Sequence, residues 1–263
     1  MRQHATRTTR LLASAALAAV IAATAAGCKT TNPTDTTGSI AMPAGPRPEA
    51  EWRRDVAVYG ERYRADNRDA EAAIRYAIAL RGIGQRNQAA AVLEQASILN
   101  PKNRAVLGAY GRALADMGSY AQAIDVLDRA HSPDQPDWRI LSVQGAVLDQ
   151  MGRPEEARRH YESALRIIPD EPSVLSNLGL SFALAKNLPQ AESTLRRAVD
   201  RPGSDRRVRQ NLALVVGLQG RFQEAEKIAR ADLPPDEAAA NVAYLRQMLA
   251  QPNSWKKLAR RAE

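Results

Sequence analysis

The sequence predicts an all-α protein built as a solenoid of helical hairpins, and three observations carry this prediction. The first is an alanine that recurs every 34 residues, at Ala89, Ala123, Ala157, Ala191 and Ala225. The second is a glycine five residues before four of these alanines, at Gly84, Gly118, Gly152 and Gly220, with Lys186 in the fourth unit. The third is a composition dominated by Ala, Leu and Arg, with only 5% aromatic residues, which favours helix over strand.

Two further columns of residues share this period and explain it physically. One column is small, at Ala77, Gly111, Gly145, Gly179 and Ala213; the other is mostly large, at Leu93, Leu127, Tyr161, Leu195 and Ala229. Small side chains let two helices cross closely, the glycine ends the first helix in a left-handed cap, and a proline near each unit's end stops the second helix. Five repeats follow, at residues 70–103, 104–137, 138–171, 172–205 and 206–239.

The flanks of the repeats have the pattern of terminal caps. Residues 49–69 place Trp52, Val56, Tyr59 and Tyr63 on one face of a predicted N-terminal capping helix. Residues 236–263 predict a C-terminal capping helix followed by a basic tail. A stack of repeats needs such helices to cover its open ends. We therefore expect a right-handed superhelix from about residue 49 to residue 250.

The N-terminus predicts a lipoprotein. Three arginines precede an almost uninterrupted apolar run over residues 11–26, which is about the length of a secretory signal and short for a membrane span. Ala-Ala-Gly then leads into Cys28, the single cysteine, as in a bacterial lipobox. We expect a signal peptide at 1–27, acylation of Cys28 and a disordered tether over 28–48, which is rich in Thr, Pro and Gly. The alternative is an ordinary signal peptide with an incidental cysteine.

This assignment predicts a location in the cell envelope. Acyl chains on Cys28 would hold the protein to a membrane facing the periplasm. Lys29 follows the cysteine, where an aspartate retains well-studied lipoproteins at the inner membrane, so the outer membrane is favoured.

The sequence gives no reason to expect chemistry. Beyond the predicted signal peptide, His131 and His160 are the only histidines, and no metalloprotease, serine hydrolase or phosphate-loop motif occurs. Removal of the predicted signal peptide takes away three arginines and lowers the formal net charge from +8 to +5, which is only mildly basic and is not a nucleic-acid footprint. We expect no enzymatic activity, no cofactor, no metal and no small-molecule substrate. Protein partners are the expected ligands.

The period of 34 with these columns resembles the tetratricopeptide repeat, whose first helices line a binding groove. That resemblance places Asn177 and Asn211 at the same groove position in repeats four and five, with Arg207, Leu180 and Leu214 beside them. An amide can donate to and accept from a peptide backbone, and an arginine can pair with a carboxylate. The alternative is that the asparagines only cap or solvate their helices. The basic tail over 256–261 is a second candidate surface.

The whole mature chain resembles the TadD family of tetratricopeptide lipoproteins from Flp/Tad pilus assembly. The lipobox at Cys28, the short tether and five repeats carry the resemblance, together with the segment Arg206–Leu249, which is its specific part. The resemblance implies a role in building the pilus machine, as an assembly factor or a pilotin for the outer-membrane secretin. A periplasmic adaptor for cell-wall hydrolases or for outer-membrane protein assembly remains an alternative, and a transferase fused to repeats is a remote one.

Overall fold

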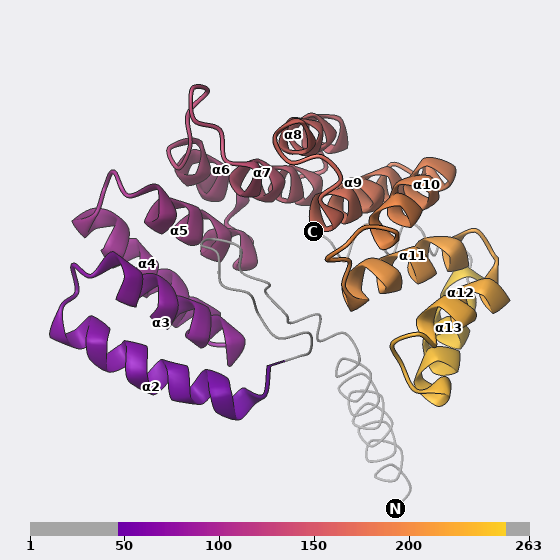
Figure 1. Ribbon diagram of the computed structural model, residues 1–263, viewed down its shortest axis with the longest axis horizontal. Helices are drawn as coiled ribbons and strands as arrows, with labels where there is room; N and C mark the ends of the chain where they lie inside the picture. The colour runs from indigo at the N-terminus through magenta and orange to yellow at the C-terminus, as the bar shows by residue number, and fades with distance from the viewer. Residues whose placement is uncertain (1–46, 251–263) are drawn as a thin grey trace, which may run out of the picture. The chain divides into compact units, whose positions relative to one another are not determined.

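The computed structural model describes residues 47–250 (Figure 1). Within them the chain forms twelve α-helices and no β-strand, with one isolated bridge between Ser132 and Gln135. The helices are α2 (Glu49–Ala65), α3 (Ala70–Gly82), α4 (Arg86–Leu99), α5 (Arg104–Asp116), α6 (Tyr120–Asp128), α7 (Trp138–Gln150), α8 (Pro154–Ile167), α9 (Pro172–Leu184), α10 (Leu188–Val199), α11 (Arg206–Leu218), α12 (Phe222–Ala229) and α13 (Pro235–Ala250). The predicted fold class, an all-α stack of helical hairpins, is confirmed for these residues.

Each helix packs mainly against the next one along the chain, and consecutive first helices of the hairpins also touch (Figure 1). The first helices are α3, α5, α7, α9 and α11, and the second helices are α4, α6, α8, α10 and α12. At the N-terminal end α2 packs on α3, with Trp52 buried. At the other end α13 contacts α11 and α12 and buries Val242.

The first helices all begin in the same way. The residue before each one turns its side chain back to accept a hydrogen bond from a backbone N–H of the first turn, which satisfies a donor that the helix cannot. These capping residues are Asp69, Asn103, Asp137, Glu171 and Asp205. They form a column of acids and one amide with the same period of 34, which our sequence analysis did not single out.

Close crossing explains the column of small residues. A Cβ added to Gly145 would lie 2.5 Å from Cε1 of Tyr161, and one added to Gly179 would lie 2.6 Å from Cγ of Leu195. Gly111 meets Leu127 in the same way, at 2.5 Å from Cγ. Because the core is close-packed, a methyl group at these positions would force the two helices of a hairpin apart. The alanine early in each second helix is buried for the same reason.

Several predicted features lie outside the described residues. They are the signal peptide, Cys28, most of the tether and the basic tail after residue 250. Among residues 47–250, none of the helices combines the length and the apolar character that crossing a membrane requires.

Candidate partner-binding groove

The candidate groove residues lie on α9 and α11, the first helices of repeats four and five, which contact each other. Asn177 and Leu180 belong to α9, and Arg207, Asn211 and Leu214 belong to α11. Helix α7 contacts α9 from the preceding repeat. The structure thus brings together on neighbouring helices the residues that the sequence period placed in one groove.

Both asparagines bridge to the preceding repeat through the same contact. Asn177 Nδ2 donates to Ser142 Oγ on α7 at 3.1 Å, and Asn211 Nδ2 donates to Ser176 Oγ on α9 at 2.9 Å. In each pair the serine is buried and the asparagine is half-buried. The two bonds repeat with the period of the fold and tie three consecutive first helices in register.

Each amide keeps groups for a ligand after this bridge is made. An asparagine side chain has two N–H donors and a carbonyl acceptor, and the serine uses one donor. In the described part of the chain, Oδ1 and the second N–H of Asn177 and Asn211 make no other hydrogen bond. An extended peptide backbone offers the complementary donor and acceptor. The bridges thus orient the two amides for such a ligand and leave one N–H and the carbonyl oxygen of each amide available to it.

At the two earlier steps of the stack, the pairs of positions equivalent to these bridges are not polar. Ile74 and Ala109 occupy them between repeats one and two, and Gly108 and Val143 between repeats two and three. A side-chain hydrogen bond is therefore excluded at both steps. We call the two bridges, Asn177–Ser142 and Asn211–Ser176, the polar ladder. It is confined to the step between repeats three and four and the step between repeats four and five, which is where the candidate groove lies.

Arg207 faces an acid that the sequence analysis did not consider. Its Nε–H donates to Asp205 Oδ2 at 3.0 Å, while Asp205 Oδ1 accepts from the backbone N–H groups of Arg207 and Val208. The capping residue of α11 thus also neutralises the arginine. A ligand carboxylate would have to share Arg207 with Asp205, which weakens this arginine as an anchor.

The two leucines differ in exposure. Leu180 is half-buried, whereas 41% of Leu214 is exposed. Of the two, Leu214 is the better placed to add apolar contact to a bound segment.

A buried polar network lies next to the first of these bridges. Asp149 on α7 accepts hydrogen bonds from Tyr161 Oη on α8 at 2.9 Å and from Ser181 Oγ on α9 at 2.8 Å. Burial raises the pKa of the Asp149 carboxyl, although the two donors and the charge of Arg158 oppose the change. Burial and the negative charge of Asp149 together raise the pKa of the Tyr161 hydroxyl. The network joins both helices of repeat three to repeat four.

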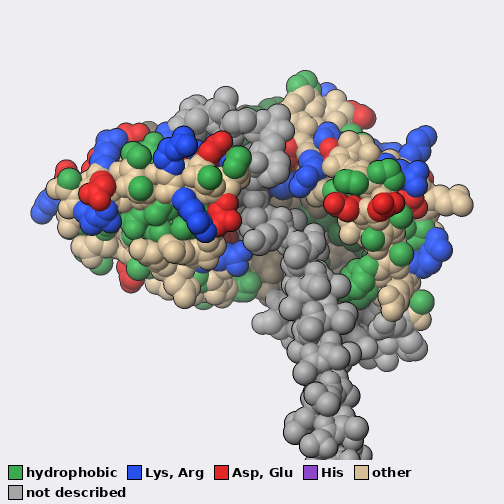
Figure 2. All heavy atoms as spheres, turned by 90° about the horizontal axis from the view of Figure 1, so that it is seen from below, with side chains coloured by type: hydrophobic (Ala, Val, Ile, Leu, Met, Phe, Trp, Pro, Cys, Tyr) green, Lys and Arg blue, Asp and Glu red, His purple; other side chains and the backbone are tan. Residues whose placement is uncertain are grey.

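Charges on the surface of the described helices are largely matched. Arg209 pairs with Asp232 through two hydrogen bonds of 2.7 and 2.6 Å, and Glu192 accepts from both Arg196 and Arg221. On the face seen in Figure 2, basic and acidic side chains are interspersed. The run around Arg207 and Arg209 is therefore not an uncompensated basic patch.

The serines and the capping acids are the parts of the site that the sequence reasoning missed. A signal for the serines existed, because Ser142 and Ser176 are 34 residues apart and each precedes its asparagine by 35. The partner of a groove asparagine can thus be found one period and one residue upstream.

Comparison with known families decides what the repeats are. Family models of the tetratricopeptide repeat match residues 80–146 and 143–206. Residues 80–206 therefore match the tetratricopeptide repeat. Tetratricopeptide repeat protein 7A of Homo sapiens is 30% identical over 86 residues, which make up 33% of this chain and 10% of the human protein. The chain therefore matches about a tenth of the length of that relative.

Solved structures share the fold of the tetratricopeptide repeats. PilW, a type IV pilus biogenesis factor, superposes with a TM-score of 0.63 at 18% identity, over 74% of this chain and 91% of PilW. The Cut9–Hcn1 hetero-tetramer of APC/C gives a TM-score of 0.60 at 14% identity, over 81% of this chain and 46% of that chain. PilF of Pseudomonas aeruginosa gives 0.50 at 17% identity, over 80% and 96%. At such identities the likeness concerns the fold.

Proposed function

We propose that the chain is a membrane-anchored scaffold that binds a protein partner in assembly of the Flp/Tad pilus, with the groove of repeats four and five as its docking site. Tetratricopeptide repeats serve protein–protein interaction, and the resemblance of Arg206–Leu249 to the TadD lipoproteins supports the pilus assignment. Two of the structures with this fold, PilW and PilF, carry names or descriptions linked to pili. On this proposal Cys28 supplies the anchor and the secretin is a candidate partner.

The observation that carries the docking site is the ladder of Asn177 and Asn211. Each amide is held by a serine and keeps one donor and one acceptor. Preorganised groups lose little entropy when a peptide binds. A segment lying across both amides can make up to four hydrogen bonds, with Leu214 in apolar contact beside them.

The double change Asn177→Ala and Asn211→Ala tests the proposal. Each lost hydrogen bond costs about 0.5–1.5 kcal/mol, so we expect binding to the partner to weaken by about tenfold or more. The partner is first captured with the acylated wild-type protein from cell envelopes, and affinity and pilus assembly are then measured. Capture of pilus components would support the pilus assignment, whereas capture of cell-wall hydrolases would favour the alternative adaptor role.

The serines provide the matched control. Ser142→Ala and Ser176→Ala remove the same two internal bonds but leave both amides in place. If the asparagines act on the ligand, the serine variants bind far better than the asparagine variants at equal helical content. Equal losses in both pairs would mean that the ladder only holds the helices in register. Normal binding by the asparagine double variant would exclude the groove and make the basic tail the next surface to test.

A further inference from the structure

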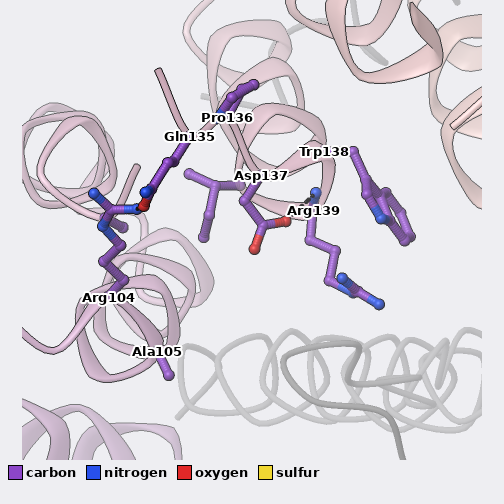
Figure 3. A pocket seen from close by; sticks show the side chains of 9 residues that line it. Arg104, Ala105, Gln135, Pro136, Asp137, Trp138 and Arg139 are labelled. Carbon is purple, nitrogen blue, oxygen red and sulfur yellow. Dashed lines mark hydrogen bonds between the residues drawn. The ribbon is translucent and has the colours of Figure 1, made fainter. Parts of the chain in front are cut away.

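The second helix of repeat two is shorter than those of repeats one and three, and a hollow lies near the place where it ends. Helix α6 stops at Asp128, after nine residues, whereas α4 and α8 each have fourteen. Residues 129–137 then form a loop with a turn closed between Ser132 and Gln135. The hollow has a volume of about 540 Å³, and Figure 3 shows it between the starts of α5 and α7. Its lining is Arg104, Ala105, Ala130, Gln135, Pro136, Asp137, Trp138, Arg139 and Ile140.

Arg139 and Trp138 form one side of this hollow. The guanidinium of Arg139 lies over the indole of Trp138, with its carbon 4.6 Å from the ring centroid, and Figure 3 shows the two side chains next to each other. Stacking of this kind fixes the plane of the guanidinium but uses none of its five N–H donors.

The fold itself supplies a reference for Arg139. Asp205 and Arg207 stand two periods after Asp137 and Arg139 and occupy the same positions at the start of α11. There the arginine pairs with the capping aspartate at 3.0 Å. In repeat three, Oδ1 of Asp137 accepts from the backbone N–H of Arg139 and so caps α7. The side chain of Arg139 does not pair with this carboxylate but stacks on Trp138. The residue between the aspartate and the arginine also differs: it is Trp138 in repeat three and Arg206 in repeat five.

Arg139 is consequently without an acid in the described part of the chain. Its side chain is half-buried, and its Nε is shielded from solvent without a hydrogen-bond partner; within residues 47–250 it forms no ion pair. Across the hollow, Arg104 donates to the neutral groups of Gln135 and Ser132. A shielded donor without a partner costs free energy, which a bound acceptor would recover.

We propose that this hollow binds an acidic segment of a partner protein, with a Glu or Asp carboxylate on the Arg139 guanidinium. The planar fork of an arginine matches a carboxylate in a bidentate pair. The indole of Trp138 and the ring of Pro136 provide apolar walls for a neighbouring side chain of the same segment. The hollow is lined by residues on and around α5 and α7, whereas Asn177 and Asn211 lie on α9 and α11, so variants at Arg139 leave both amides in place.

Two short peptides test the proposal on the full chain in mild detergent. The probes are acetyl-Gly-Phe-Glu-Gly-amide and its glutamine counterpart, and the readout is the NMR signal of the Trp138 indole N–H, assigned with Trp138→Phe. We expect the glutamate peptide to shift this signal and to bind about tenfold more tightly than the glutamine peptide, as a charge-assisted bond should.

Variants at Arg139 separate recognition from folding. Arg139→Gln should abolish the preference for glutamate, and Arg139→Lys should retain only part of it, because lysine keeps the charge without the fork. Arg166→Gln, at an exposed position on α8, should retain the full preference. Equal binding of both peptides, or an unchanged preference in Arg139→Gln with wild-type helical content, would overturn the proposal.

Two further measurements exclude other occupants. Inorganic phosphate that moved the Trp138 signal as far as the glutamate peptide would assign the hollow to a phosphate ligand instead. A second measurement deletes residues 251–263. If the deletion moves the Trp138 signal and neither the full chain nor the truncated chain responds to the peptides, the hollow is occupied by the chain's own C-terminal segment. Either result would overturn the proposal.

Discussion

Lys186 is the residue that departs most clearly from its column. The glycines after the first helices of the other four repeats have φ between 73° and 81°, in the left-handed region. Lys186 takes φ of 62° at the same place and keeps the turn, with its N–H bonded to the carbonyl of Ala183. Side chains with a Cβ adopt this conformation at a cost of about 1–2 kcal/mol, so the fourth repeat carries local backbone strain.

Lys186→Gly should therefore stabilise the protein. Relief of the strain is partly offset because glycine loses more backbone entropy on folding. We expect the free energy of unfolding to rise by about 0.5–1 kcal/mol, measured by urea denaturation.

Gly152→Lys is the reciprocal control, since Gly152 takes φ of 73° with no atom near its missing Cβ. Strain alone should then make this substitution destabilising by a similar amount. A Lys186→Gly variant no more stable than the wild type would show that other contacts of the lysine compensate the backbone.

At the scale of the elements, the sequence predicted the features that recur in every repeat and missed those that occur in single repeats. Columns of period 34 located the hairpins because close helix crossings need small residues at fixed places. Helices α6 and α12 have only nine and eight residues, and the period carries no information about their early ends. The bridges from Asn177 and Asn211 were within reach of the same periodic reasoning, but the pairing of Arg207 with its own capping residue required coordinates.

The contact between α7, α8 and α9 through Asp149 should make stability depend on pH. Burial raises the pKa of this carboxyl above its unfolded value of about 3.9, so the folded state favours the protonated form. The stabilising contribution is complete below the unfolded pKa and is lost as the pH rises through the folded pKa. Tyr161 and Ser181 can each hydrogen-bond to a neutral side chain at this position as well.

Asp149→Asn should remove this dependence. Relative to the variant, we expect the wild type to gain stability when the pH falls from 7 to 4, measured by urea denaturation at three pH values. Asp125→Asn is the control, because Asp125 is exposed on α6. A difference between wild type and Asp149→Asn that stays constant over this range would contradict the assignment of the raised pKa to Asp149.

At the scale of the whole molecule, the proposed role needs the repeats to be held at a membrane. Both candidate binding sites belong to the helices of residues 47–250, and the proposed anchor is Cys28, outside the described residues. Each buried CH₂ of an acyl chain contributes about 0.8 kcal/mol to membrane binding, and stable anchoring takes two chains or a second signal. The anchor should therefore decide where the protein is found and leave the fold of the repeats unaffected.

Cys28→Ser separates these two properties. We expect the variant to remain unprocessed or to appear in the soluble fraction, to take up no labelled fatty acid, and to retain the helical content and urea midpoint of the wild type. If the groove of repeats four and five is the docking site, the purified variant should still bind the captured partner with wild-type affinity while pilus assembly fails. Absence of acyl label on the wild-type protein would refute the lipobox assignment, and the membrane role would then have to come from the partner.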